Sequence, residues 1–114
     1  MCVLRCIVFN IFHNISRNQL LCVVTDEEVK SVAVCAGSGT AVLSAVQADL
    51  FITGEMSHHD LLNVVHCGTS VILCEHSNTE RGFLSVLLPQ LHSLFEGSVD
   101  VCLSAQDRDP VEII

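Results

Sequence analysis

A histidine and a glutamate stand four residues apart in the stretch ILCEHSNTERGFL, residues 72–84. They are His76 and Glu80, and they lie where an apolar run gives way to a polar step. An imidazole and a carboxylate within reach of the same space are a common ligand pair for zinc, iron or manganese. The same residues also contain Ser77-x-x-Glu80, a helix capping box in which Glu80 would bind backbone N–H groups without any metal. Spacing alone favours the capping box, because two ligands do not make a metal site.

A glycine turn, AGSGT at residues 36–40, opens a second polar step. The free backbone N–H groups of Ser38, Gly39 and Thr40 at the start of a helix would suit an anion such as phosphate. The turn lacks the lysine of a P-loop and the full glycine spacing of a dinucleotide site. A plain tight turn therefore explains these residues at least as well as an anion site does.

The third polar step is GEMSHHD at residues 54–60. It places Glu55 at the end of a predicted strand and Ser57 at the N-cap of a predicted helix, with Asp60 three residues later. His58 and His59 are adjacent in that helix, so their side chains point about 100° apart and cannot easily bind one ion. The pattern favours a capped helix with two exposed imidazoles.

Alternating strands and helices must position these three steps. The short β-branched runs predict four strands and the helical spacings predict three helices, which together indicate an α/β fold with a mainly parallel sheet. Pro89 is expected to kink or split the last helix. In such a sheet the carboxyl ends of the strands lie along one edge, where ligands collect. The predicted strands are residues 29–36, 48–54, 69–74 and 98–104, and the predicted helices are residues 40–47, 57–68 and 79–97.

Composition bounds the function. The chain has 114 residues, enough for one domain, and a net charge of −8 with only five lysines and arginines, so direct nucleic-acid binding is not expected. No apolar run approaches the length of about 20 residues that a membrane span needs. Cys35, Cys74 and Cys102 lie in apolar runs, which predicts buried, reduced thiols and a reducing compartment.

The first 28 residues differ from the remainder. They contain no acidic residue before Asp26, and their apolar residues follow no regular period. Their interruptions do not suit a secretory signal, and they fit a mitochondrial presequence less well than an extra strand or a poorly ordered tail. The pattern therefore divides the chain into an unrelated or poorly ordered segment, 1–28, and an α/β region, 29–114.

Four blocks in order, VAVCAGSGT, ADLFITGEMSHHD, VILCEHSNTERGFL and DRDP, resemble the C-terminal part of the NIF-three-like protein family, also labelled GTP cyclohydrolase I type 2-like. The animal members are the most similar. The resemblance implies one half of a larger α/β fold that assembles as a homo-oligomer. It also implies that His76 and Glu80 match two ligands of a site for two divalent metal ions, zinc, iron or manganese. Glu55 and Ser57 match a stretch that lines the site.

The resemblance implies that the family's other metal ligands lie in an N-terminal half that this chain lacks, so we expect the chain not to hold metal tightly. It assigns no catalytic residue. Two functions stay open: a regulatory protein that binds other proteins, such as transcriptional regulators, in the cytoplasm and also the nucleus, and a metal-dependent hydrolase or cyclohydrolase acting on a phosphorylated or nucleotide-like substrate. The binding protein is favoured for this chain.

Overall fold

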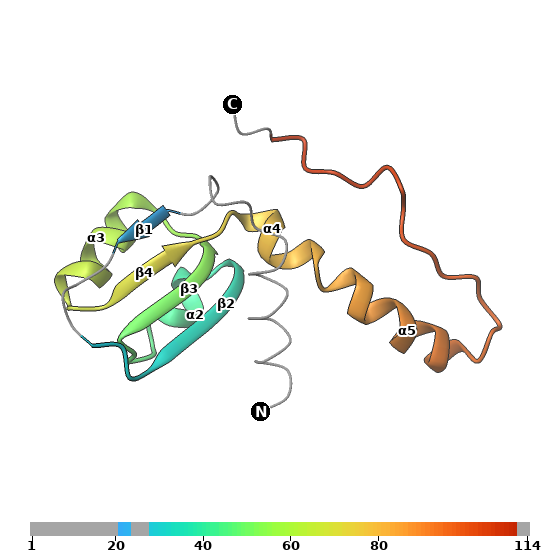
Figure 1. Cartoon of the computed structure of the whole chain (residues 1–114), viewed down its shortest axis with the longest axis horizontal. Coiled ribbons are helices and arrows are strands. Elements are labelled where there is room, and N and C mark those ends of the chain that lie inside the picture. The colour runs from blue at the N-terminus through green and yellow to red at the C-terminus, as the bar shows by residue number, and fades with distance from the viewer. Residues whose placement is uncertain (1–20, 24–27, 112–114) are drawn as a thin grey trace.

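A four-stranded sheet forms the centre of the computed structural model, which describes residues 21–23 and 28–111 (Figure 1). The strand order is β1-β4-β3-β2, in which β2, β3 and β4 are parallel and β1 is antiparallel to β4. Three parallel strands confirm the predicted sheet, because short runs of β-branched residues between polar turns suit buried parallel strands. The strands are β1 (Leu21–Val23), β2 (Val32–Ser38), β3 (Leu50–Glu55) and β4 (Ser70–Leu73).

Two helices cover one face of the sheet. They are α2 (Thr40–Leu43), which is shorter than predicted, and α3 (His58–His66). Leu43 and Leu61 of these helices pack with Phe51 and Val71 of β3 and β4 to form the main buried cluster. Ile52 and Cys74 form a second cluster, because successive residues of a strand point to opposite faces.

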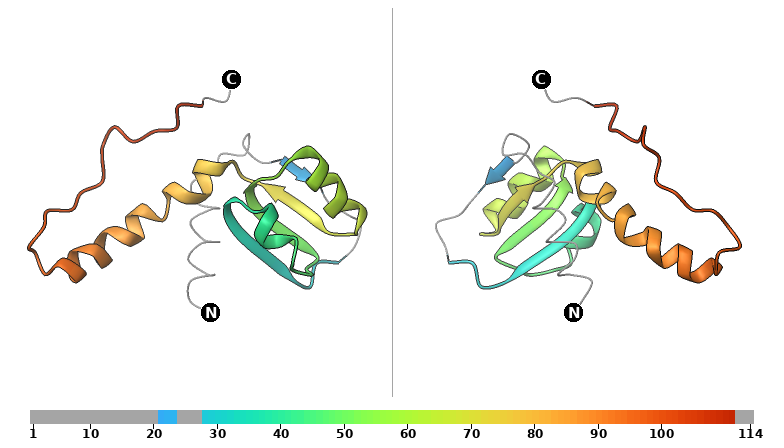
Figure 2. Two further views of the ribbon diagram at one scale, coloured as in Figure 1. Left: turned by 180° about the vertical axis from the view of Figure 1, so that it is seen from behind. Right: turned by 45° about the vertical axis from the view of Figure 1, so that its right-hand side comes forward.

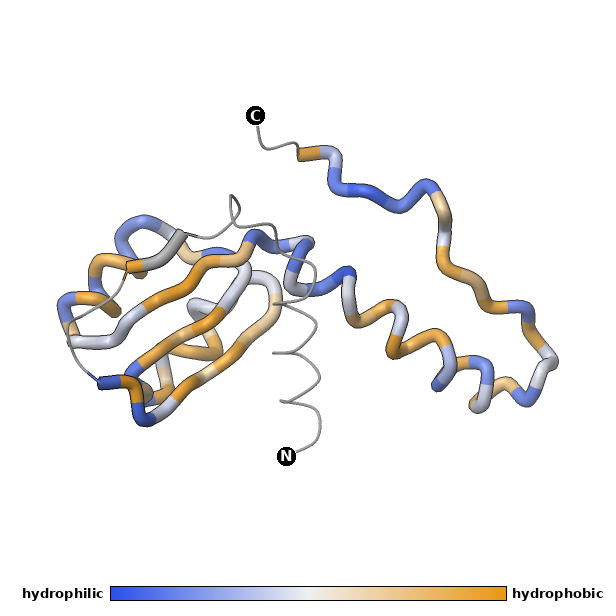
Figure 3. The backbone as a smooth tube through the Cα atoms, viewed as in Figure 1, coloured by the Kyte–Doolittle hydropathy of each residue, from blue (hydrophilic) through white to orange (hydrophobic). Residues whose placement is uncertain are grey.

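The helices α4 (His76–Arg81) and α5 (Leu84–Phe95) follow β4. Helix α4 lies at the carboxyl ends of β2 and β3, whereas α5 leads away from the sheet, and the chain after it runs back alongside (Figures 1 and 2). Figure 3 shows the apolar residues concentrated on the three parallel strands, with a further apolar series along α5. In the part of the chain that the structure describes, no helix is both long and apolar enough to cross a bilayer.

Three expectations, about the last strand, two of the cysteines and the last helix, are wrong. Residues 98–104 do not form the predicted fourth parallel strand, and the sheet's fourth strand is instead β1. Consequently Cys102 is exposed and Cys35 is only half-buried, whereas Cys74 is buried as expected. The predicted helix 79–97 is divided at Gly82 and Phe83, while Pro89 lies inside a continuous α5.

Candidate functional site

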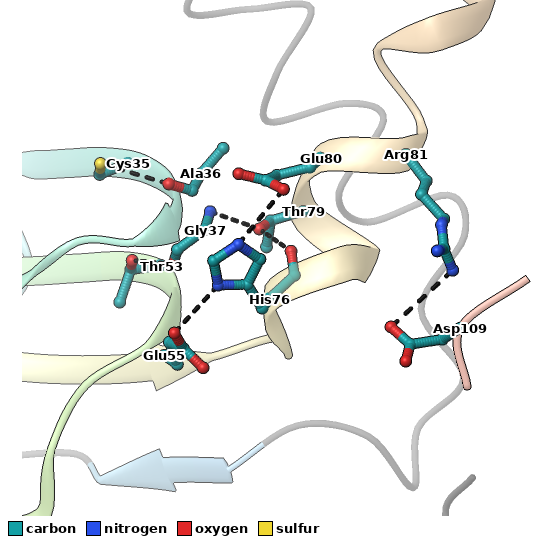
Figure 4. Close-up of polar contacts among 10 residues, drawn as sticks. All are labelled: Cys35, Ala36, Gly37, Thr53, Glu55, His76, Thr79, Glu80, Arg81 and Asp109. Carbon is teal, nitrogen blue, oxygen red and sulfur yellow. Dashed lines mark hydrogen bonds and ion pairs between the residues drawn. The ribbon is translucent and has the colours of Figure 1, made fainter. Parts of the chain in front are cut away.

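The three polar turns that follow β2, β3 and β4 meet at the carboxyl ends of these parallel strands, as the topology predicts. Glu55 ends β3, and His76 begins α4 two residues after Cys74. Gly37, the second-last residue of β2, lies beside both (Figure 4). Gly37 of β2 and Thr79 of α4, 42 positions apart in the sequence, therefore become neighbours at this edge.

His76 lies between two carboxylates. Its Nδ1 atom is 2.9 Å from Oε1 of Glu55, and its Nε2 atom is 3.3 Å from Oε2 of Glu80 (Figure 4). The hydrogen bond to Glu55 raises the pKa of His76 above its ordinary value; desolvation opposes this effect, and the charges of Glu80, Glu55 and Asp109 add to the increase. Since a carboxylate only accepts hydrogen bonds and attracts a positive charge, both contacts favour an imidazolium that donates from Nδ1 to Glu55 and is paired in charge with Glu80.

Thr79 fixes the backbone beneath the histidine. Its hydroxyl donates to the carbonyl of His76 at 2.7 Å and accepts from the N–H of Gly37 at 2.8 Å. The side chain of Thr79 is only 6% exposed, so both bonds lie away from solvent. Through this one hydroxyl, the start of α4 is attached to the end of β2.

Two glycines allow the close approach of these elements. A Cβ atom on Gly54 would lie 2.6 Å from the carbonyl oxygen of Gly37 and 2.9 Å from Cα of His76. Gly37 itself has a φ of +66°, and a Cβ atom there would lie 2.5 Å from Oε1 of Glu80. A larger residue at Gly54 would push α4 away from the strands, whereas one at Gly37 would displace the side chains of Glu80 and His76.

The expected capping box at the start of α4 is wrong. Helix α4 begins at His76, one residue before Ser77, and its N-cap Glu75 makes no side-chain cap bond. Glu75 adopts a φ of 68°, a conformation that costs a non-glycine residue on the order of 1 kcal/mol or more. Glu80 therefore turns its carboxylate toward His76 instead of the backbone.

Arg81 connects α4 to the C-terminal part of the chain. Its Nε atom is 3.3 Å from Oδ2 of Asp107, and its Nη1 atom is 3.8 Å from Oδ2 of Asp109 (Figure 4). A hydrogen bond from Ser77 is the main cause of a lowered pKa for the Asp109 carboxyl, followed by the N–H of Val111 and the Arg81 charge. The sequence DRDP at residues 107–110 thus lies next to TER at residues 79–81.

The remaining candidate residues have local roles. Ser57 caps α3 as predicted, since its hydroxyl accepts from the N–H of Asp60 at 3.2 Å and donates to the Asp60 carboxylate at 2.6 Å. Gly39 is the N-cap of the short α2, with Ser38 before it and Thr40 after it, and a Cβ atom on Gly39 would clash with Thr53. Close packing against β3 thus accounts for this glycine without an anion.

His76 and Glu80 have the geometry of two ligands of one divalent ion. Ligand atoms about 2.0–2.2 Å from a tetrahedral ion lie about 3.3 Å apart, and Nε2 and Oε2 are separated by 3.3 Å. Glu55 on Nδ1 would orient the ring, as carboxylates behind metal-bound histidines do. Across residues 21–23 and 28–111, no group of three or more His, Cys, Asp and Glu side chains is arranged to hold an ion. His76 and Glu80 would thus supply two of the three or four protein ligands that zinc usually takes.

Sequence patterns missed four of the residues that build this site. Thr79, Gly37, Arg81 and Asp109 act through contacts between distant segments, which no local spacing reveals. The contact of Glu55 with His76 likewise spans 21 residues. Topology indicates only part of the site from the sequence, because the turns at 36–40, 54–60 and 75–80 are expected at one sheet edge, whereas the segment with Asp109 is not.

Comparison with known proteins identifies the family. The sequence model described as Duf34/NIF3 (NGG1p interacting factor 3) matches residues 4–110 of the chain. This chain belongs to the Duf34/NIF3 family. The match confirms the family that the four sequence blocks resemble. It also begins inside the segment 1–28 that sequence patterns set apart; most of that segment lies outside the described residues, and its separation stays a prediction.

Duf34/NIF3 relatives are similar over most of this chain. The human NIF3-like protein 1 is 56% identical over 89 residues, which are 78% of this chain and 24% of the human protein. The Saccharomyces cerevisiae NGG1-interacting factor 3 is 46% identical over 88 residues, 75% of this chain and 30% of the yeast protein. The chain therefore spans about a quarter of the length of the human relative.

Solved structures show the same fold. A Bacillus cereus protein related to NIF3 superposes with a TM-score of 0.69 at 22% identity, covering 83% of this chain and 28% of that one. TTHA1606 from Thermus thermophilus superposes with a TM-score of 0.59 at 34% identity, covering 68% of this chain and 33% of that one. The α/β fold of the Duf34/NIF3 family therefore accounts for the parallel sheet.

Proposed function

We propose that this chain is a protein-binding, self-associating regulatory protein of the transcriptional co-regulator type, present in the cytoplasm and also the nucleus, and that it carries half of a divalent-metal site. The observation that carries the proposal is the apolar surface of α5. The printed name of the yeast relative, NGG1-interacting factor 3, supports it because that name states a protein interaction. The net charge of −8 favours protein partners over nucleic acid.

Helix α5 has the character of an interface helix. None of its residues is buried, and the sequence LSVLLPQLHSLF contains no lysine, arginine, aspartate or glutamate. Leu94 is 72% exposed, and Leu84 and Phe95 are each more than one-third exposed. Exposed apolar side chains gathered on one helix are costly to leave in water and are typical of interaction sites. The same helix leads away from the sheet, which makes it accessible to a partner (Figure 2).

Leu94→Lys tests the proposal. Burying a leucine stabilises by about 2 kcal/mol, so we expect the lysine to weaken association about 30-fold for each Leu94 that the interface buries. Val111→Lys is the matched control, because Val111 is also 72% exposed but lies outside α5. Self-association is measured by sedimentation equilibrium, and binding to purified yeast NGG1 protein by surface plasmon resonance. A wild-type chain that neither self-associates nor binds, or a Leu94→Lys chain that equals wild type, contradicts the proposal.

A metal-dependent hydrolase or cyclohydrolase acting on a phosphorylated or nucleotide-like substrate is the second candidate. The Glu55–His76–Glu80 arrangement favours it, because it orients one imidazole and one carboxylate toward a common point. Zinc, iron or manganese bound there would supply an activated water molecule. His76 and Glu80 would hold the ion, and Glu55 would keep the imidazole in the orientation that leaves Nε2 available.

Metal analysis separates the two candidates. We expect the chain alone to lose added zinc, iron or manganese during dialysis against a mild chelator, since it offers two ligands where tight sites use three or four. His76→Ala is the test variant, and His92→Ala in α5 is a control histidine on the surface. Stoichiometric metal that survives dialysis, is lost in His76→Ala and is kept in His92→Ala would favour the hydrolase. Cleavage of p-nitrophenyl phosphate would then measure turnover.

A further inference from the structure

We propose that the outer edge of β2 is a docking surface for a β-strand, and that its occupant is residues 98–104 of a second copy of this chain. The inference rests on the self-association in the proposed function and adds a second contact to the one that α5 makes. Strand addition to a sheet edge is a common way for chains to associate, because main-chain hydrogen bonds supply affinity directly.

The edge of β2 presents unpaired backbone groups. In the described sheet β2 borders only β3, and the N–H of Leu50 donates to the carbonyl of Ser31 at 3.1 Å. Successive residues of a parallel strand direct their backbone groups to alternate sides, so those of Val32 and Val34 point away from β3. The N–H of Gly37 is already bound to Thr79. The open stretch is therefore residues 32–36.

Among the described residues, this open stretch lacks the usual protection of an edge strand. Its sequence is VAVCA, with no charge and no proline, and Val32 is 45% exposed. Natural edges are normally shielded by lysines, prolines, bulges or a covering element, because a flat apolar edge recruits other strands. The register shift in β2 lies at its far end, between Cys35 and Ser38, and leaves the first residues regular.

Residues 98–104 have a strand-like sequence but belong to no sheet in the described structure. Their sequence, SVDVCLS, places Val99, Val101 and Leu103 at every second position, which is the period of a strand. Val99 is 47% exposed and Leu103 is 45% exposed, and no backbone hydrogen bond among the described residues joins 99–103 to a strand. The segment has as many residues as β2, which has seven. It therefore matches the open edge in length, pattern and unused hydrogen-bonding groups.

The fold directs this pairing toward a second copy. Helix α5 carries residues 98–104 away from the sheet of their own chain (Figures 1 and 2). The ion pairs of Arg81 with Asp107 and Asp109 then hold the following residues near α4. A second copy can instead bring its β2 to the exposed segment, and each chain can both give and receive a strand. Such reciprocal exchange makes a closed, symmetric pair.

Two proline variants test the pairing. Val32→Pro removes an outward N–H at the first residue of an edge strand, where proline is tolerated, and Val101→Pro removes an N–H from the donated segment. Val29→Pro, at an exposed residue before β2, is the control. By sedimentation equilibrium we expect each test variant to associate at least tenfold more weakly than wild type, and Val29→Pro to match it. An equimolar mixture of the two test variants should associate more tightly than either alone, because it restores one intact edge and one intact segment.

Several results would overturn the inference. Pairing in trans is refuted if either test variant associates as tightly as wild type. It is also refuted if the mixture of the two variants does not recover part of the wild-type association. Hydrogen exchange gives an independent measurement: protection of residues 98–104 should rise with protein concentration, and protection independent of concentration would mean pairing within one chain. Thermal unfolding checks that Val32→Pro stays folded, and Val101→Pro decides alone if it does not. If the chain self-associates equally tightly with and without the two prolines, only this inference is overturned. If the wild-type chain is monomeric at all concentrations, the proposed self-association is overturned as well.

Discussion

Thr79→Val removes the hydroxyl that joins β2 to α4 while keeping the shape of the side chain. Wild-type Thr79 is 6% exposed, and its hydroxyl makes two hydrogen bonds, at 2.8 Å and 2.7 Å. The substitution leaves the buried N–H of Gly37 without a partner, which costs about 1–3 kcal/mol, and it also removes a bond to the carbonyl of His76 worth about 1 kcal/mol. We therefore expect the free energy of unfolding to fall by about 2–4 kcal/mol.

The assay is urea unfolding followed by far-UV circular dichroism, since the chain has no tryptophan or tyrosine to report by fluorescence. With a slope of about 1–2 kcal/mol per molar urea, the midpoint should fall by about 1–4 M. Thr79→Ser is the matched control, because it keeps the hydroxyl and loses one methyl group, at a cost of about 1 kcal/mol. If Thr79→Val proves as stable as Thr79→Ser, the hydroxyl does not hold the two elements together and the reasoning fails.

Three other perturbations examine the same region. In metal-free protein, Glu55→Gln should lower the pKa of His76, measured by NMR titration, because it replaces the carboxylate that does most to raise that pKa; an unchanged pKa would contradict this. The raised pKa of His76 stabilises the folded chain below a pH of about 6.5, the ordinary pKa of histidine, and this stabilisation is lost as the pH rises through the folded-state pKa. Over this pH range Glu55→Gln should therefore lose less stability than wild type. Gly37→Ala should destabilise by about 1–2 kcal/mol in urea unfolding, because φ is +66° there; wild-type stability would count against that strain. In native protein a thiol reagent should label the exposed Cys102 rapidly and the buried Cys74 slowly, and equal rates would be the opposing result.

The parallel strands were predictable because their pattern is local. Runs such as VKSVAVCA and TSVILC are short, β-branched and bounded by turn residues, and the resulting strands are β2 and β4. SVDVCLS has the same pattern but forms no strand, since strand formation depends on a partner and not on propensity alone. Sequence also misplaced the break in the last helix, because Pro89 in an exposed helix lacks only one hydrogen bond, while Gly82 and Phe83 lie where the chain turns away from the sheet.

The site was predictable in its location but not in its contacts. Strand topology placed the three polar steps at one edge, and His76 with Glu80 do approach each other there. The capping box failed because Glu75 takes a positive φ, which starts α4 one residue early and turns Glu80 toward the imidazole. No local rule predicts that conformation, since isolated glutamates rarely adopt it. The support from Thr79 was equally hidden, as it depends on a backbone N–H 42 residues away.

The attachment of α4 to the ends of β2 and β3 also has a consequence for the order of folding. The contacts that orient His76 join segments 21 and 42 residues apart, so they can form only after the chain has closed long loops. Contacts of high sequence separation tend to form late and slowly. The parallel strands that carry the site have to close loops of similar length, because β2 pairs with β3 and β3 with β4 between residues 17–20 positions apart. In a refolding experiment the NMR signature of the His76–Glu55 pair should therefore not precede the sheet's circular dichroism signal, and the charges at this edge would come together only as the sheet itself is assembled.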